Sequence, residues 1–383
     1  MRYILLLLAS CIFCFLQLVL VPVSSWTWSS SRQLDNIGPK VSGHSCIVAS
    51  TNPDKLLLFG GLTGSSGSPT TADLWKYEHE DGDSTSSIGD GSSASRKRWD
   101  LLPTKMQGIS RPGKRMYSAS AVLAGDNTQH ESFYLFGGWD PEEPGSGGKF
   151  LDDIWKFSLE TNKWDLCSAR LPFPISRHSA CAIGPDEIVI YTHKGILLFS
   201  FDGRDWSVSE QPTTGDGPDG FSMCATCGIS NSSSSAELGQ DLLVFGGSTQ
   251  TQELSSATYV LCTQSWTWRK LLVVDDDTPA PLASSCASSI IGRDNQCVIF
   301  GGATLGETGL IPQRDTWLLT VNGDSVEWKK IAVGGGDDDD DACRPEGRVA
   351  ASLTAIGDGI VLQGGWDPVT KETYDQTWIL NDK

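Results

Sequence analysis

Five glycine pairs, each closing an apolar run, most strongly constrain how this chain can fold. They are Gly60-Gly61, Gly137-Gly138, Gly246-Gly247, Gly301-Gly302 and Gly364-Gly365. An apolar run that ends in two glycines is typical of a buried strand with a sharp backbone exit, because glycine reaches angles that a Cβ forbids. Halfway across the widest gap, the run Glu187 to Thr192 is present but Thr192-His193 stands where the glycines would be. The chain therefore contains six related units.

Aromatic residues recur at matching positions in these units, which are spaced by about 55 to 77 residues. Downstream of the glycine pairs, one strand is marked by Trp75, Trp155, Tyr259, Trp317 and Trp378, and the next by Trp99, Trp164, Trp206, Trp268 and Trp328. Another strand precedes each glycine pair, as in Arg115 to Val122. Four antiparallel strands per unit, repeated at this spacing, predict a propeller or a solenoid.

The sixth unit is one strand short, because the chain ends soon after Trp378. The missing strand, with its tryptophan, is present at the other end as Trp26-Thr27-Trp28. We expect it to complete the last sheet and close a ring, which leaves only short, protected sheet edges.

This pattern of a strand, a glycine pair and a tryptophan-bearing strand resembles the kelch repeat. The resemblance covers residues 26–383 and implies an all-β fold, a six-bladed kelch β-propeller whose ring is closed by the mature N-terminal strand pairing with the C-terminal blade. The third unit departs from the pattern at Thr192-His193. The predicted blades span approximately residues 41–103, 113–167, 177–210, 218–273, 282–333 and 346–383 plus 26–29.

Residues 1–25 have the pattern of a secretory signal peptide rather than of a folded element. Arg2 precedes an apolar run from Ile4 to Val23, and small residues follow at Ser24 and Ser25. The alternative is an uncleaved membrane anchor, because the run is long enough to span a bilayer. Both readings place the remaining chain outside the cytosol, either secreted or in the lumen of the secretory pathway.

The net charge argues against two classes of partner. Without residues 1–25 the chain holds 28 basic and 47 acidic residues, a net charge of −19. Such a surface repels phosphate backbones and anionic lipids, so we expect neither nucleic acid nor a peripheral membrane as partner.

Nine cysteines remain after residue 25, and an oxidising compartment would be expected to pair some of them. Cys224 and Cys227 have redox-motif spacing, but residues three apart in a strand point to opposite faces, so we expect no metal or redox site there. The serine-rich segment contains Asn231-Ser-Ser, a glycosylation acceptor in a secreted chain.

The kelch resemblance also implies a binding rim, formed by the loops after each glycine pair and the loops between blades. In such propellers, basic residues before the first strand often contact acidic ligands. The candidates here are Arg115, Arg177 and Arg348, with His44 and His178 nearby. The competing interpretation is that each arginine only pairs with a neighbouring loop.

Two units share a longer string, Gly-Gly-Trp-Asp-Pro, which contains Trp139 and Asp140 in one and Trp366 and Asp367 in the other. An exposed Trp beside a carboxylate suits sugar stacking or a peptide hot spot. The alternative is structural, since Asp-Pro opens ordinary turns and the Trp can cap the blade core.

The sequence offers little support for catalysis, since common nucleophile, zinc and phosphate-loop motifs are absent. We therefore expect a non-enzymatic scaffold that binds a protein or carbohydrate ligand, with no catalytic residue, metal or cofactor. The resemblance keeps one alternative open, a carbohydrate-active enzyme similar to the sialate mutarotases or, less well matched, to galactose oxidase. That alternative rests on fold analogy.

Overall fold

A computed structural model describes residues 26–30, 38–49, 54–64, 69–80, 96–103, 110–124, 131–144, 147–230, 240–274, 278–331, 344–357 and 359–382. Residues 1–25, which hold the predicted signal, and Asn231 lie outside this set. None of the described residues forms a helix long and apolar enough to cross a membrane.

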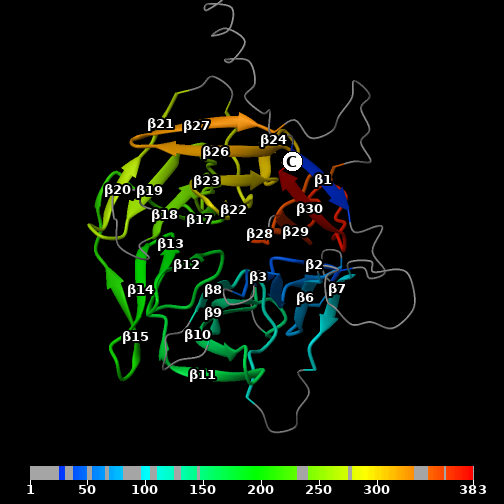
Figure 1. Cartoon of the computed structure of the whole chain (residues 1–383), viewed down its shortest axis with the longest axis vertical. Coiled ribbons are helices and arrows are strands. Elements are labelled where there is room, and N and C mark those ends of the chain that lie inside the picture. Colours follow the sequence, from blue (N-terminus) through cyan, green and yellow to red (C-terminus); the bar gives the residue numbers. More distant parts are fainter. Residues whose placement is uncertain are drawn as a thin grey trace, which may run out of the picture.

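Six antiparallel sheets surround a central axis as the blades of a propeller (Figure 1). The first three are blade 1, of β3 (Ser45–Val48), β4 (Lys55–Phe59), β6 (Leu74–Glu80) and β7 (Arg96–Leu101); blade 2, of β8 (Ala119–Leu123), β9 (Ser132–Asp140), β10 (Lys149–Ser158) and β11 (Lys163–Arg170); and blade 3, of β12 (Ser179–Gly184), β13 (Glu187–Thr192), β14 (Gly195–Phe201) and β15 (Trp206–Gln211).

The other three are blade 4, of β17 (Ala225–Ser230), β18 (Gln240–Phe245), β19 (Thr258–Cys262) and β20 (Thr267–Lys270); blade 5, of β22 (Cys286–Ile290), β23 (Arg293–Phe300), β26 (Thr316–Asn322) and β27 (Ser325–Lys330); and blade 6, of β28 (Ser352–Ile356), β29 (Gly359–Gln363), β30 (Thr377–Asp382) and β1 (Trp26–Ser30). Two short strands extend the outer edges of blades in parallel: β16 (Thr214–Gly215) pairs with β20 of blade 4, and β21 (Leu272–Val273) pairs with β27 of blade 5. Two small antiparallel ladders pair β2 (Val41–Ser42) with β5 (Leu62–Thr63) and β24 (Ala303–Gly306) with β25 (Gly309–Pro312). The first strands of neighbouring blades contact each other all around the axis.

The N-terminal strand β1 is the outer strand of blade 6. It pairs antiparallel with β30, with Trp28 opposite Leu380. The Trp28 indole N–H donates to Thr316 Oγ1 of blade 5 at 3.1 Å, just as Trp99 of blade 1 donates to Thr377 Oγ1 of blade 6 at 2.9 Å. Trp28 thus occupies the position in blade 6 that Trp99 occupies in blade 1.

The glycine pairs fasten each blade to the next. The N–H of the second glycine donates to a carbonyl at the start of the following blade at 2.7 to 2.9 Å, including Gly365 to Val41 between blades 6 and 1. A Cβ on the first glycine would lie only 2.3 to 2.8 Å from that same carbonyl oxygen. All ten glycines also have positive φ, a region that other residues rarely adopt. Both positions therefore require glycine.

Blade 3 makes the corresponding hydrogen bond to the next blade without a glycine pair. The register places Tyr191 where Phe136 stands in blade 2, immediately before the glycine pair. Its hydroxyl donates to the Phe221 carbonyl of blade 4 at 2.9 Å and lies 3.1 Å from the Pro218 carbonyl. A side-chain hydroxyl thus replaces the backbone N–H used at the other five seams.

Apolar side chains between neighbouring blades form the core. Trp164 of blade 2 packs its edge against Phe59 of blade 1 at 5.3 Å between ring centroids, and Phe136 of blade 2 packs against Phe199 of blade 3, also at 5.3 Å. No blade buries both of its faces alone. Stability therefore depends on the complete ring.

Candidate functional site

Six residues in the left-handed conformation, one from each blade, encircle one mouth of the central channel. Each N–H donates to the carbonyl of its counterpart in the neighbouring blade, and the last bond, from Gly43 to the Ala350 carbonyl at 2.8 Å, closes the circle. Their φ angles lie between +53° and +62°. The six residues are Gly43, Tyr117, Arg177, Met223, Ser284 and Ala350.

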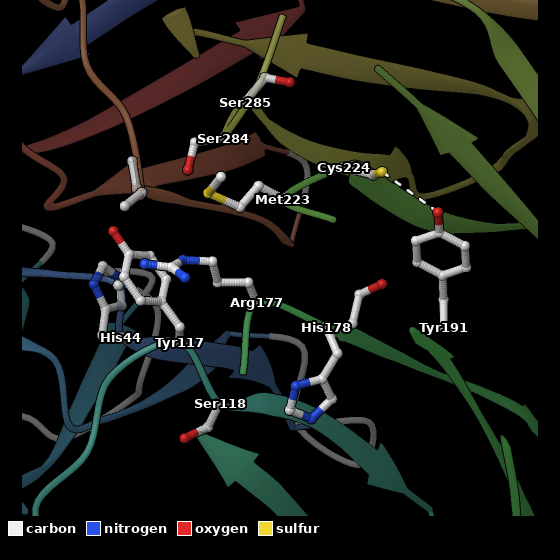
Figure 2. A pocket seen from close by; sticks show the side chains of 14 residues that line it. His44, Tyr117, Ser118, Arg177, His178, Tyr191, Met223, Cys224, Ser284 and Ser285 are labelled. Atoms are coloured by element: carbon white, nitrogen blue, oxygen red, sulfur yellow. Dashed lines mark hydrogen bonds between the residues drawn. The ribbon is translucent and has the colours of Figure 1, made fainter. Parts of the chain in front are cut away.

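The side chains at these six positions make the mouth asymmetric. Tyr117, Arg177 and Met223 stand on consecutive blades, whereas Ser284, Ala350 and Gly43 complete the circle with small groups. Figure 2 shows Arg177 and Tyr117 side by side at the cavity that these residues line, which has a volume of about 160 Å³. Of its 14 lining residues, Arg177 alone carries a charge at neutral pH.

Arg177 belongs to a mainly aromatic group that we call the rim cluster: Tyr117, Trp139, Arg177, Trp366 and Lys371. The exposed guanidinium is 5.2 Å from the Tyr117 ring centroid and 5.9 Å from that of Trp139. The Trp366 side chain hydrogen-bonds Tyr117, and the Lys371 ammonium lies 5.2 Å from the Trp366 ring. Burial raises the pKa of Tyr117, although the charge of Arg177 and the Trp366 bond oppose this, so its hydroxyl stays protonated at neutral pH.

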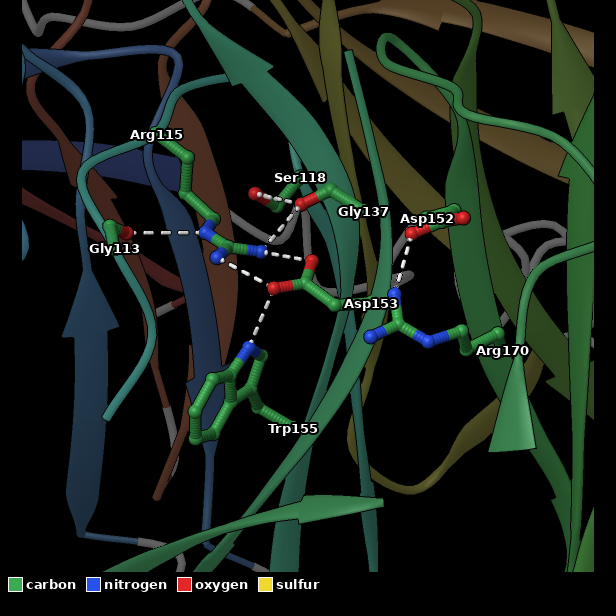
Figure 3. Close-up of polar contacts among 8 residues, drawn as sticks. All are labelled: Gly113, Arg115, Ser118, Gly137, Asp152, Asp153, Trp155 and Arg170. Atoms are coloured by element: carbon green, nitrogen blue, oxygen red, sulfur yellow. Dashed lines mark hydrogen bonds and ion pairs between the residues drawn. The ribbon is translucent and has the colours of Figure 1, made fainter. Parts of the chain in front are cut away.

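The other two candidate arginines are buried in ion pairs. Arg115 is 2% exposed and makes a two-pronged pair with Asp153 at 2.6 and 2.9 Å, and it also donates to the carbonyls of Gly113 and Gly137 (Figure 3). Burial alone would raise the pKa of Asp153, but the hydrogen bonds and charge of Arg115 outweigh it and hold that pKa below its usual value. The pair therefore stays ionised within the fold.

In blade 6, Arg348 makes the matching backbone hydrogen bonds but has a different carboxylate partner. It is 1% exposed, donates to the Gly364 carbonyl at 3.1 Å, pairs with Glu346 and lies 4.0 Å from the Tyr374 ring centroid. Arg115 and Arg348 both stand two residues before the left-handed position, whereas Arg177 occupies that position itself. The sequence analysis grouped the three as equivalent, and the structure corrects this register.

Asp140 and Asp367 each close a turn with a side-chain oxygen. Asp140 Oδ1 accepts the Glu142 N–H at 3.0 Å, and Asp367 Oδ1 accepts the Val369 N–H at 2.7 Å. Each bond closes a short Asp-Pro turn, which matches the structural alternative stated for these residues. The turns hold Trp139 and Trp366 in the rim cluster.

His44 and His178 lie one residue beyond the left-handed circle, at equivalent places in blades 1 and 3. His44 Nε2 is 2.8 Å from Ser352 Oγ. Burial lowers the pKa of His44 to about 3 and that of His178 to about 4, the latter opposed by the Phe136 carbonyl. Both imidazoles are therefore neutral at neutral pH, and neither attracts an anion by charge.

The cysteines give no sign of a metal or redox pair at Cys224 and Cys227. Cys224 Sγ lies 3.7 Å from the Tyr191 hydroxyl, whereas Cys227 shares a hydrogen bond with Cys297, which is a different partner. The described part of the chain contains no cluster of three or more metal-ligating side chains. The eight cysteines it includes are free thiols, so the disulfides expected of an oxidising compartment are not seen there.

The sequence analysis missed Tyr117 and Lys371. Tyr117 could have been found from its place two residues after Arg115, once the left-handed position is known to carry the side chains of the mouth. Lys371 has no such signal, because its position depends on the turn that Asp367 opens.

The fold defines a six-bladed propeller with the rim cluster at one channel mouth, and comparison with known proteins gives its family. The KLHDC2/KLHL20/DRC7 Kelch-repeats domain matches residues 13–233 and 192–383. The chain therefore belongs to this kelch-repeat family. It is also similar to the solved structure of YjhT, with 16% sequence identity and a TM-score of 0.58 over 90% of this chain and 95% of that chain. At this identity the likeness shows the fold alone.

Proposed function

We propose that this chain is a secreted or luminal kelch-repeat binding scaffold that recognises an acidic group of a protein or carbohydrate partner at the rim cluster. This proposal rests on the exposure of Arg177 and on its lack of an ion-pair partner in the part of the chain that the structure describes. Its guanidinium is exposed, and among the described residues no carboxylate forms an ion pair with it. In a chain of net charge −18, such a cation is available to a ligand.

The surrounding rings favour recognition by Arg177. Its contacts with Tyr117 and Trp139 hold the side chain in place, so that less side-chain freedom is lost when a ligand binds. A guanidinium donates two parallel hydrogen bonds to a carboxylate or a sulfate. Trp139, which contacts Arg177, and Trp366, which contacts Tyr117, add partly exposed aromatic surface. The site therefore suits an anionic group beside an apolar or sugar face.

Replacing Arg177 by Ala tests this proposal, with Arg204→Ala as the matched control. Arg204 is an exposed arginine of the same blade in the turn between β14 and β15. Tagged variants secreted into culture medium would be used for affinity capture and then for direct titration of the captured partner. We expect Arg177→Ala to weaken binding by roughly 10- to 100-fold, the cost of losing a charged hydrogen bond, and Arg204→Ala to bind normally.

The same variants address the enzymatic alternative. The rings of Trp139 and Trp366 also offer faces on which a sugar ring can stack. For this reason a carbohydrate-active enzyme is the alternative function. Turnover of free sugars by the wild type, lost in Arg177→Ala, would favour the enzyme. A partner bound equally well by wild type and Arg177→Ala would reject the rim cluster, and a tagged chain retained in the cytosol would reject the secreted location.

A further inference from the structure

Two buried thiols from neighbouring blades meet in the core of the propeller. Cys227 lies on β17 of blade 4 and Cys297 on β23 of blade 5, and the two side chains share a hydrogen bond. They are 9% and 0% exposed and belong to one apolar cluster together with Leu243, Val260 and Ile299. The strands that carry them contact each other (Figure 1). Neither thiol belongs to the rim cluster.

Two other cysteines lie near Cys227 in space or in sequence, and both have other contacts. Cys181 of blade 3 is close enough to Cys227 to interact with it by charge, but its Sγ lies 3.8 Å from Gln240 Oε1. Cys224 stands only three residues before Cys227, and its Sγ lies 3.7 Å from the Tyr191 hydroxyl. The hydrogen bond of Cys227 therefore singles out the thiol of blade 5 as its partner.

The core position of the pair decides when its two thiols can react. The hydrogen bond to Cys297, and then burial, raise the pKa of Cys227 well above its usual value. Because the thiolate is the form that attacks a disulfide, thiol exchange at Cys227 is slow once the blades have packed. Cys297 is fully buried, so an external disulfide does not reach it in the folded ring. A bond between the two sulfurs must therefore form while blades 4 and 5 come together, and burial then protects it from reductants.

We propose that Cys227 and Cys297 form a disulfide that joins blades 4 and 5 when the chain folds in the presence of a disulfide oxidant. Each thiol loses one proton and one electron as the sulfur–sulfur bond forms, and the oxidant, a disulfide of the glutathione class, is reduced to two thiols. The structure shows the reduced pair, with both thiols free. In the cell the step needs an oxidising compartment and so rests on the proposed location, whereas refolding in vitro does not.

The disulfide reinforces a seam between blades that hydrogen bonds already hold. At this seam the Gly247 N–H donates to the Leu282 carbonyl at 2.7 Å. A covalent link from β17 to β23 closes a long loop of chain that contains the outer strands of blade 4. Such a link stabilises the fold chiefly by restricting the unfolded chain, and the effect grows with the length of the closed loop.

Refolding with a defined oxidant tests the pair. The reduced, denatured chain is refolded in a mixture of reduced and oxidised glutathione, its remaining thiols are blocked with iodoacetamide in denaturant, and the protein is digested without reductant. Mass spectrometry with fragmentation should find Cys227 linked to Cys297 and Cys224 alkylated. The oxidised protein should also unfold at a higher urea concentration than the same protein after reduction with dithiothreitol.

Cys227→Ala and Cys297→Ala should each abolish the link and the effect of dithiothreitol on unfolding. Cys224→Ala is the matched control and should keep both, and so should Arg177→Ala, whose loss of a partner leaves this bond intact. If a core variant does not refold, the mapping of the wild type still decides. Two alkylated thiols in the refolded wild type, a link from Cys227 to Cys181 or Cys224, or an equal effect of dithiothreitol on wild type and Cys297→Ala would overturn the proposal.

Discussion

At the scale of single residues, position relative to the left-handed circle decides what an arginine does. Arg115 and Arg348 lie two residues before it and are buried in ion pairs, whereas Arg177 lies on it and faces the mouth. The sequence could predict that arginines, histidines and tryptophans gather near this mouth. It could not separate these roles, because a shift of two residues leaves the apolar pattern of the strands unchanged.

His178 should make the protein less stable in acid. Its pKa in the folded state is about 4, below the ordinary value of 6.5, so the unfolded state binds more protons as the pH falls below 6.5. The contribution of His178 to the unfolding free energy is therefore fully present above pH 6.5 and is lost progressively down to about pH 4. At pH 5 this contribution is about 2 kcal/mol lower. Urea unfolding at pH 7 and pH 5 measures this loss.

His178→Gln is the comparison for that experiment, because glutamine does not titrate. The difference in unfolding free energy between the two pH values should be smaller in the variant by the amount assigned to His178. An identical difference in both proteins would show that His178 titrates normally in the fold.

At the scale of elements, the sequence predicted that the glycine pairs end strands, but it did not predict that they hydrogen-bond the next blade. Their function depends on which carbonyl of the next blade each N–H meets, and that is a long-range contact. The same limit applies to Tyr191, whose hydroxyl reaches the Phe221 carbonyl. In sequence, Tyr191 differs from the phenylalanines of blades 1, 2, 4 and 5 by one oxygen, and its role depends on the absence of glycines after it.

Gly137→Ala should weaken the seam between blades 2 and 3. The added Cβ would lie 2.8 Å from the Ile175 carbonyl oxygen and 2.9 Å from that of Leu151, at a φ of +49°. We expect a loss of roughly 2 to 3 kcal/mol in unfolding free energy, from backbone strain and a displaced neighbour. Gly113→Ala is the control, since nothing lies within 4 Å of its Cβ position, and its effect should stay within about 0.5 kcal/mol. Equal stability of the two variants would contradict the fastening role.

At the scale of the whole molecule, the number of blades and the use of the N-terminal segment could both be predicted from the sequence. Each blade has its own aromatic markers, and the strand missing from the last unit is present at the start of the chain. The way in which the linker between blades 3 and 4 folds against Trp268 could not be predicted, because the pairing that fixes it joins residues far apart in the sequence.

Trp28→Ala tests how far the ring depends on β1. The ring of Trp28 is 7% exposed, packs its edge against Phe300 at 5.6 Å and bonds Thr316. Its removal leaves a cavity between blades 5 and 6, and we expect a loss of about 3 to 5 kcal/mol in thermal or urea unfolding. Ser29→Ala, at an exposed position of the same strand, loses only the long hydroxyl bonds to Ile379 and Asn381 and should cost about 1 kcal/mol or less. A mild effect of Trp28→Ala would mean that β1 contributes little to the ring.

The pairing of β1 with β30 also constrains how the protein is made. The two strands join residues 350 positions apart, such as Ser29 and Ile379, so the ribosome synthesises β1 long before β30. Blades 1 to 5 can assemble in order during translation, whereas blade 6 cannot be completed until β30 has left the ribosome. A premature stop before β30 would therefore leave the edges of β1 and β29 exposed, and such edges are ready templates for aggregation.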